Sequence, residues 1–301
     1  MSDSINVMEA EFEKFGIGQP VPRKEDPMLV TGKGRYTDDI NLPGQAFAVM
    51  VRSPIAHGVI NGIETDDAKA MPGVLAIYTG HDLIAAGLSK MASGMSFKQR
   101  DGSDMPKPVQ VPLAIDKVRY VGDPVAIVIA ETRYQARDAA ESVFLDIEQL
   151  PAVTSATNAA KPGAPQLWDA TPGNVVLDFH HGDTEAVDKA MAEAAHVVSM
   201  EIDNPRIVVA AMEPRSAIAE YAAGEEHFTL RLGCQGAFPM RNNIAGLLGV
   251  EREKVRVLVS NVGGSFGMKS APYPEYVALL HSAKQLGRPV KWTDERSESF
   301  L

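Results

Sequence analysis

Residues 263–269 (GGSFGMK) contain the residue types best suited to hold a ligand. Glycine adopts a positive φ without a steric penalty and lets backbone amides approach a bound group closely. Amides that converge in such a loop, or at the start of a helix, attract anions. The stretch could therefore cradle a phosphate or another electron-rich cofactor group, although a glycine-dense turn is more often a tight connection without a ligand.

Two nucleotide-binding patterns do not fit this stretch. A P-loop requires the order Gly-Lys-Ser/Thr and the dinucleotide fingerprint requires G-x-G-x-x-G, and residues 263–269 contain neither. A site built from several cysteines is excluded as well, because Cys234 is the one cysteine of the sequence. We expect Cys234 to be a small buried apolar residue.

Other residues that could do chemistry have structural interpretations that fit better. His180 and His181 are adjacent at the end of an expected strand, so their side chains point to opposite faces and cannot easily bind one metal ion together. Glu213 is expected to pair with Arg215 or with a backbone amide rather than to act as a catalytic base.

The glycine-rich loop needs a strand before it and a helix after it to fix its position. Residues 254–261 alternate polar and apolar side chains and predict the strand, and residues 274–286 predict the helix. A helix at 184–195 has Asp183 as its N-cap, and another is predicted at 238–249. Further strands are predicted at 175–179, 197–203, 210–221, 227–233 and 289–293.

The first half of the chain has a similar mixture of helix and strand. An apolar strand at 125–130 (VAIVIA) is followed by a helix whose start is indicated by Thr132 and Gln135, in the spacing of a capping box. The remaining expectations are strands at 47–52, 74–78 and 144–150, a strand and turn at 118–124, a long loop at 84–110 and a short helix at 8–15.

A stretch with four prolines, residues 151–174, is the best candidate for a linker between domains. We therefore expect an N-terminal tail at 1–17, a first domain at 18–150 and a second domain at 175–301. The mixture of elements predicts the α+β fold class.

Composition and charge restrict the class of protein. The chain has 301 residues, of which 45% are hydrophobic, so it can bury one large core or two ordinary ones. Its formal net charge of −10 disfavours nucleic acid and anionic membranes as partners. Without a secretory signal or a long apolar run, and with a single cysteine, we expect a cytoplasmic protein that does not span a membrane.

Several stretches occur in a characteristic order along the chain: RKEDPMLVTGKGRYTDDINLPG (23–44), VRYVGDPVAIVIAET (118–132), MEPRSAIAEY (212–221) and NVGGSFGMKSAPYPEY (261–276). Together they resemble the molybdenum-binding subunits of the xanthine dehydrogenase and aldehyde oxidase family, especially its bacterial carbon-monoxide-dehydrogenase-like branch. The resemblance spans roughly residues 17–301. It implies an α/β hammerhead domain followed by the first, incomplete part of a molybdopterin-binding domain.

By this resemblance, two parts of the second domain flank the molybdenum. Gln235, at the end of a strand, would donate its side-chain amide to an oxo ligand of the metal. Backbone amides of the loop would hold the cofactor from the other side, and no residue of the chain would bind the metal directly. The loop residues that match the family's are Gly263, Gly264, Ser265, Phe266 and Gly267.

Three positions depart from the family's pattern. Ser265 and Met268 stand where glycines are common in other members, and a serine weakens any requirement for a positive φ. Ser270, on the substrate side, stands where purine-hydroxylating members have a glutamate. The resemblance therefore argues against xanthine as the substrate.

The resemblance also implies a larger enzyme. Its reaction would be the oxidative hydroxylation of an aldehyde or an N-heteroaromatic carbon with oxygen from water. Molybdopterin cytosine dinucleotide would be shared with a second molybdenum-subunit polypeptide that carries the catalytic base, so this chain would be inactive alone, as part of a split or truncated subunit. Electrons would pass to an iron–sulfur subunit and a flavin (FAD) subunit. The alternative is a non-catalytic remnant or assembly module that binds partner subunits without cofactor.

Overall fold

The computed structural model describes three ranges of the chain: 22–88, 90–91 and 95–301. The chain divides into two units, Met1–Arg35 and Tyr36–Leu301. The described part of the first unit contains the short helix α1 (Asp26–Leu29). The helix expected at 8–15 lies outside the described residues.

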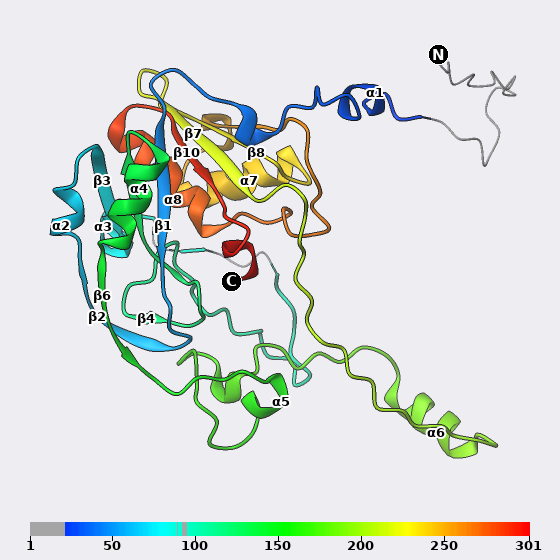
Figure 1. Cartoon of the computed structure of the whole chain (residues 1–301). Coiled ribbons are helices and arrows are strands. Elements are labelled where there is room, and N and C mark those ends of the chain that lie inside the picture. The colour runs from blue at the N-terminus through cyan, green and yellow to red at the C-terminus, as the bar shows by residue number, and fades with distance from the viewer. Residues whose placement is uncertain (1–21, 89, 92–94) are drawn as a thin grey trace, which may run out of the picture. The chain divides into compact units, whose positions relative to one another are not determined.

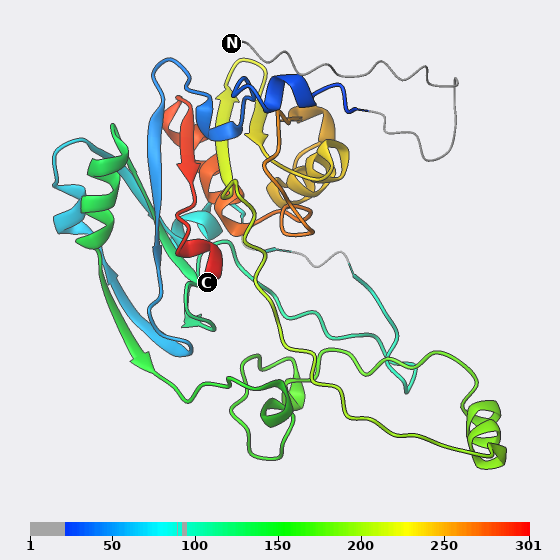
Figure 2. The ribbon, with the colours of Figure 1, turned by 45° about the vertical axis from the view of Figure 1, so that its right-hand side comes forward.

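Seven strands form the main sheet of the second unit (Figure 1; turned by 45° in Figure 2), in the order β3 (Val74–Thr79), β5 (Pro124–Ala130), β1 (Ala46–Arg52), β10 (Val290–Thr293), β7 (Ser216–Ala222), β8 (His227–Leu232) and β9 (Val255–Leu258). β1 runs parallel to β10, with Ala46 opposite Val290, and antiparallel to β5 on its other side. Both domains expected from the sequence therefore contribute strands to one sheet. Their exact boundaries stay a prediction.

β5 is buried along its whole length because helices pack on both of its faces. Ile127 belongs to the apolar cluster that includes α8 (Pro274–Leu286), whereas Ala126 belongs to the cluster that includes α4 (Arg133–Glu141). Adjacent residues of a strand point to opposite faces, so both faces must be apolar here. This explains why the sequence VAIVIA lacks the polar alternation of a half-exposed strand.

A smaller antiparallel sheet completes the strands of this unit, in the order β4 (Lys117–Val118), β2 (Gly58–Glu64) and β6 (Phe144–Gln149). Within the described ranges, no helix is both long and apolar enough to cross a membrane. The other helices are α2 (Asp66–Lys69), α3 (Gly80–Ala85), α5 (Ala156–Ala159), α6 (Thr184–Glu193) and α7 (Ala237–Leu248), with 3-10 turns at Thr37–Asp39, Pro172–Asn174, Arg252–Lys254 and Glu298–Phe300.

The helix starts agree with the capping residues expected from the sequence. Thr132 Oγ1 accepts the Gln135 backbone N–H at 3.2 Å at the start of α4. The Thr132 hydroxyl donates to Gln135 Oε1 at 3.0 Å. In a full capping box, the glutamine side chain would instead accept the Thr132 backbone N–H. Asp183 Oδ1 accepts the Ala186 N–H at 3.0 Å and caps α6 as expected.

Two expected strands are wrong. Residues 175–179 and 197–203 are irregular, because no neighbouring strand among the described residues forms a ladder with them. Residues 175–179 meet the chain near Arg100, whose N–H donates to the Asp178 carbonyl at 2.7 Å, but no ladder continues from that bond. A strand pattern gives a stable strand only where a partner completes its hydrogen bonds.

Several other boundaries differ from expectation by a few residues. The strand expected at 210–221 begins only at Ser216, and the one expected at 254–261 ends at Leu258, before the glycine-rich loop. The strand at 118–124 is reduced to two paired residues, Lys117–Val118. The mixture of helices and sheets confirms the α+β class.

Candidate functional site

The glycine-rich loop follows β9 and is anchored by Glu213, which precedes β7. The Gly263 N–H donates to Glu213 Oε2 at 2.8 Å, and the Glu213 N–H donates to the Gly263 carbonyl at 3.1 Å. A Cβ at Gly263 would lie 2.4 Å from the Glu213 Cβ, so no side chain fits at this position. The expected pairing of Glu213 with a backbone amide is confirmed, and its pairing with Arg215 is wrong.

Lys269 fixes the other end of the loop. Its ammonium group donates to Glu213 Oε2 at 2.7 Å and to the Glu213 carbonyl at 3.0 Å. The lysine is 1% exposed. Removing one member of a buried ion pair typically costs about 3–5 kcal/mol, because the other charge is left uncompensated. Glu213 and Lys269, which we call the loop brace, therefore tie both ends of the loop to one side chain.

Gln235 lies beside this loop, between β8 and α7. Its backbone N–H donates to the Lys269 carbonyl at 3.2 Å, and its Oε1 accepts the Gly267 N–H at 3.1 Å. Gln235 Nε2 donates to no group within the described residues, so both of its protons can bind another group. Gln235 is also exposed, so the structure brings its amide and the expected loop residues together at an accessible place.

Three consecutive backbone amides of the loop have no acceptor within the described part of the chain, namely those of Gly264, Ser265 and Phe266. Gly264 has φ of 102° and Phe266 has φ of 50°, whereas Ser265 between them is not left-handed. Alternation in the sign of φ is the backbone feature of nests, in which successive N–H groups face a bound anion. A left-handed φ is uncommon for a bulky residue, and the Phe266 side chain is 80% exposed.

The two serines of this region use their hydroxyl groups within the loop. Ser265 Oγ accepts the Lys269 N–H at 3.0 Å, and the Ser270 hydroxyl donates to the Gly267 carbonyl at 2.7 Å. Ser265 therefore stabilises the turn that leads to the loop brace through its hydroxyl oxygen, which acts there as an acceptor. Ser270 is exposed where the loop ends.

Arg215 lies in a buried polar cluster behind the loop. Its guanidinium stacks 4.1 Å from the centre of the Tyr273 ring and pairs with Asp294 at 3.1 Å and Glu275 at 3.4 Å. Burial, the largest influence, raises the pKa of Glu275, but the nearby guanidinium groups outweigh it and the net shift is downward. The Tyr273 hydroxyl donates to the Met268 carbonyl at 2.8 Å, which connects this cluster to the loop.

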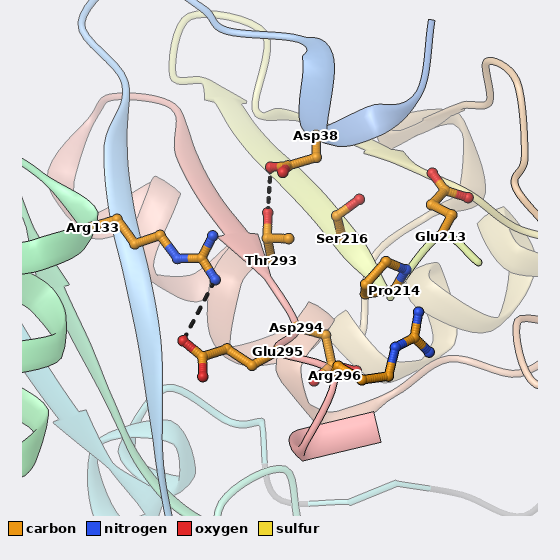
Figure 3. A pocket seen from close by; sticks show the side chains of 9 residues that line it. All are labelled: Asp38, Arg133, Glu213, Pro214, Ser216, Thr293, Asp294, Glu295 and Arg296. Atoms are coloured by element: carbon orange, nitrogen blue, oxygen red, sulfur yellow. Dashed lines mark hydrogen bonds and ion pairs between the residues drawn. The ribbon is translucent and has the colours of Figure 1, made fainter. Parts of the chain in front are cut away.

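Glu213 also lines a cavity of about 420 Å³ (Figure 3). The charges in its wall are largely paired: Asp38 accepts the Thr293 hydroxyl at 2.6 Å, and Glu295 lies 3.7 Å from Arg133. This cavity could not be predicted from the sequence, because its lining comes from segments far apart in the chain. The lining residues are Asp38, Arg133, Glu213, Pro214, Ser216, Thr293, Asp294, Glu295 and Arg296.

The remaining candidates behave as structural residues. Cys234 is buried, and burial raises the pKa of its thiol. His180 Nε2 hydrogen-bonds to Thr184 Oγ1 at 3.0 Å, and the His181 ring stacks 6.4 Å from the Phe179 ring. Among the residues described, no three His, Cys, Asp or Glu side chains are grouped to hold a metal ion.

Comparisons with known proteins identify the two parts of the chain. Residues 31–151 match the family model "Aldehyde oxidase and xanthine dehydrogenase, a/b hammerhead domain", and residues 167–301 match "Molybdopterin cofactor-binding domain". The solved quinoline 2-oxidoreductase of Pseudomonas putida 86 superposes with a TM-score of 0.83 at 33% identity, over 96% of this chain and 36% of that one. The CO dehydrogenase of Oligotropha carboxidovorans gives 0.81 at 33% identity, over 94% and 35%.

Sequence relatives agree with the structural ones. The nicotine 6-hydroxylase large subunit of Paenarthrobacter nicotinovorans is 36% identical over 95% of this chain and 34% of its own length. The carbon monoxide dehydrogenase large chain of Hydrogenophaga pseudoflava is 34% identical over 98% and 37%.

The chain thus combines an aldehyde oxidase and xanthine dehydrogenase a/b hammerhead domain with a molybdopterin cofactor-binding domain, and this pair of domains defines its class. The chain belongs to the xanthine dehydrogenase and aldehyde oxidase family. It spans about a third of the length of the relatives it matches.

Proposed function

We propose that the chain supplies one wall of a molybdopterin site in a molybdenum hydroxylase. One observation carries the proposal: donors that have no acceptor in the described part of the chain gather around an anchored loop. They are the Nε2 group of Gln235 and the backbone N–H groups of Gly264, Ser265 and Phe266. Donors held in place before a ligand arrives need no reorganisation to bind electron-rich oxygen or sulfur atoms. The residues present therefore fit the cofactor that the family model names.

Each part of the loop has a role in this proposal. When bound, molybdopterin cytosine dinucleotide supplies the redox chemistry that hydroxylates an aldehyde or an N-heteroaromatic carbon with oxygen from water. The Gln235 Nε2 group would donate a hydrogen bond to the metal end of the cofactor, and the backbone amides from Gly264 to Phe266 would hold the cofactor from the other side. The Gly267 amide fixes the Gln235 carboxamide so that its Nε2 faces outward. Ser270 lies on the substrate side, and no residue of this chain acts as the catalytic base or binds the metal directly.

In this proposal, the rest of the enzyme is supplied by further polypeptide, which either continues this chain or is separate from it. The relatives include proteins named as large or gamma subunits, and about two thirds of their length has no counterpart in this chain. A second molybdenum-subunit polypeptide would carry the base and complete the cofactor site. An iron–sulfur subunit and a flavin subunit would take the electrons.

Metal and pterin analysis of the assembled complex tests the proposal. The complex that contains this chain is purified, its molybdenum is measured by mass spectrometry, and released pterin is measured by fluorescence. We expect molybdenum and pterin together, in amounts comparable to that of the chain. An active, complete complex without either one would contradict the proposal. An inactive complex without either one would favour the assembly-module alternative.

A further inference from the structure

Residues 175–210 expose many large apolar side chains. Soluble proteins seldom leave such groups uncovered together, and where they do the surface usually binds a partner. The same residues include seven Asp and Glu against one Lys and one Arg, so the segment is also strongly acidic. The exposed apolar residues are Val175, Val176, Phe179, Val187, Met191, Val197, Val198, Met200, Ile202, Ile207 and Val208.

Within this segment, residues 197–203 (VVSMEID) have the side-chain pattern of a half-buried strand. Val198, Met200 and Ile202 are 86%, 77% and 76% exposed and alternate with polar residues. Alternate residues of a strand share one face, so an extended backbone would place these three side chains together. The pattern specifies an apolar face that the described residues do not cover.

The backbone of residues 197–203 is equally without a partner. None of its N–H or C=O groups hydrogen-bonds to another group in the described ranges of the chain. An extended segment with free backbone groups and one apolar face readily adds to the edge of another sheet. Backbone and side chains thus both indicate strand addition.

We infer that residues 197–203 add as a strand to a β-sheet of the polypeptide that makes up the rest of the molybdenum subunit. Val198, Met200 and Ile202 form the buried face of the added strand. This inference rests on the proposed function, because it takes as occupant the two thirds of the relatives' length that this chain does not match. That polypeptide is the occupant whether it continues this chain or is separate from it.

Charge favours this occupant over a second copy of the chain. Two copies would bring two acidic segments together, and like charges across an interface are repulsive. The occupant should therefore present Lys and Arg side chains beside the apolar strip, opposite Glu201 and Asp203. A basic rim would also steer the two polypeptides together, so that their association should weaken as salt concentration rises.

Site-specific photo-crosslinking in the assembled complex tests the inference directly. A photoreactive amino acid is placed at Met200 or, as a control on the opposite face, at Ser199, and crosslinked peptides are sequenced by mass spectrometry. We expect position 200 to crosslink to sequence that resembles the unmatched part of the relatives, and position 199 to crosslink much less. Crosslinks to a second copy, to an unrelated protein or to nothing would each overturn the inference.

Charge substitution provides an independent measurement. Met200→Asp should weaken association with the remaining polypeptide at least roughly tenfold, because it places a carboxylate in an apolar contact. Ser199→Asp adds the same charge on the solvent face and should change association less than threefold. Both positions are exposed, so both isolated variants should unfold at the temperature of the unmodified chain. Equal weakening by both variants would contradict an oriented strand.

The inference and the proposed function can fail separately. If position 200 crosslinks to the expected polypeptide in a complex without molybdenum, the inferred interface stands and the proposed hydroxylase function is contradicted. If the complex contains molybdenum and pterin but residues 197–203 stay free, the proposed function stands and the inferred interface is contradicted. Hydrogen exchange distinguishes the two, since strand addition should slow exchange of the amides of residues 197–203 at least tenfold.

Discussion

The glycine-rich loop and residues 197–203 differ in opposite directions in two properties: the regularity of their sequence pattern and the hydrogen bonds that hold them. Residues 263–269 have no regular secondary structure, yet Glu213, Lys269 and Gln235 hold them through short hydrogen bonds. Residues 197–203 have a regular strand pattern, yet none of their backbone groups is bonded in the described ranges. Local order in this chain therefore follows from available partners and not from the regularity of the sequence.

The comparison also separates two kinds of binding surface. The loop itself is anchored by the buried Glu213–Lys269 pair, and the Gln235 carboxamide is held by the Gly267 N–H. Such preorganisation suits a cofactor, whose atoms must be placed accurately. In residues 197–203 the surface is apolar and gains its geometry only from the sheet that it joins. Such a segment suits assembly with a polypeptide.

The largest effect on this comparison should come from breaking the loop brace. Lys269→Met leaves Glu213 buried without a counter-charge and should lower the free energy of unfolding by about 3–5 kcal/mol. Lys189→Met is the matched control in the exposed segment, where Lys189 lies 4.0 Å from Glu193 and both are exposed. Its effect should stay below about 0.5 kcal/mol. Urea unfolding of the isolated variants measures both free energies. Similar losses would show that the buried Glu213–Lys269 pair stabilises the chain no more than an exposed ion pair does.

A smaller effect should come from removing the loop-held carboxamide. Gln235→Ala should lower turnover per assembled complex roughly 10- to 100-fold, the range seen when an outer hydrogen-bond partner of a metal site is lost. Assembly itself should be unchanged, because Gln235 is exposed. Gln285→Ala, an exposed glutamine on α8, is the control and should keep full turnover. Loss of the complex with normal turnover in what remains would assign Gln235 to structure alone.

The smallest effect concerns pH. Burial raises the pKa of Asp123 from 3.8 to about 6, despite opposing bonds and charge from Arg119. The folded state thus holds the proton more tightly than the unfolded chain. The stabilisation from this group is complete below pH 3.8 and is lost as the pH rises through about 6.

Removing that carboxyl group should remove its pH dependence. Between pH 4 and pH 7, Asp123→Asn should gain on the order of 1–2 kcal/mol relative to the unmodified chain, a value reduced for solvent screening. Thermal unfolding of Asp123→Asn and of the unmodified chain across this pH range measures the difference in stability. A constant difference between Asp123→Asn and the unmodified chain would contradict a raised pKa.

Some features of the site could be predicted from the sequence, for identifiable reasons. The helix at 274–286, the apolar strand at 125–130 and the cap at Asp183 follow from local pattern and are confirmed. The association of Gln235 with the loop came from family resemblance, since no spacing rule relates the two. The structure confirms that they are in contact, and their cofactor role stays a proposal.

Other features depend on contacts that a local pattern does not contain. Glu213 and Lys269 are 56 positions apart, and neither position by itself indicates a buried ion pair. The left-handed conformation of Phe266, on which the free amides depend, falls on a residue type that disfavours it. The failed strand predictions at 175–179 and 197–203 have the same origin, because pattern alone does not tell whether a partner strand is present.

Molybdenum content of a loop variant tests the central claim most directly. Gly264 has φ of 102°, and a Cβ there would lie 3.0 Å from the Phe266 ring and 3.3 Å from the Ala211 Cβ. Gly264→Leu should therefore strain the backbone and displace Phe266, and so disturb the amides of the loop, whereas Gly224→Leu, where a Cβ meets nothing within 4 Å, is the control. Circular dichroism of both variants checks that they are folded. We predict that the assembled complex with Gly264→Leu contains at least tenfold less molybdenum and pterin than the control. Normal molybdenum and pterin in that variant would contradict the assignment of this loop to the cofactor.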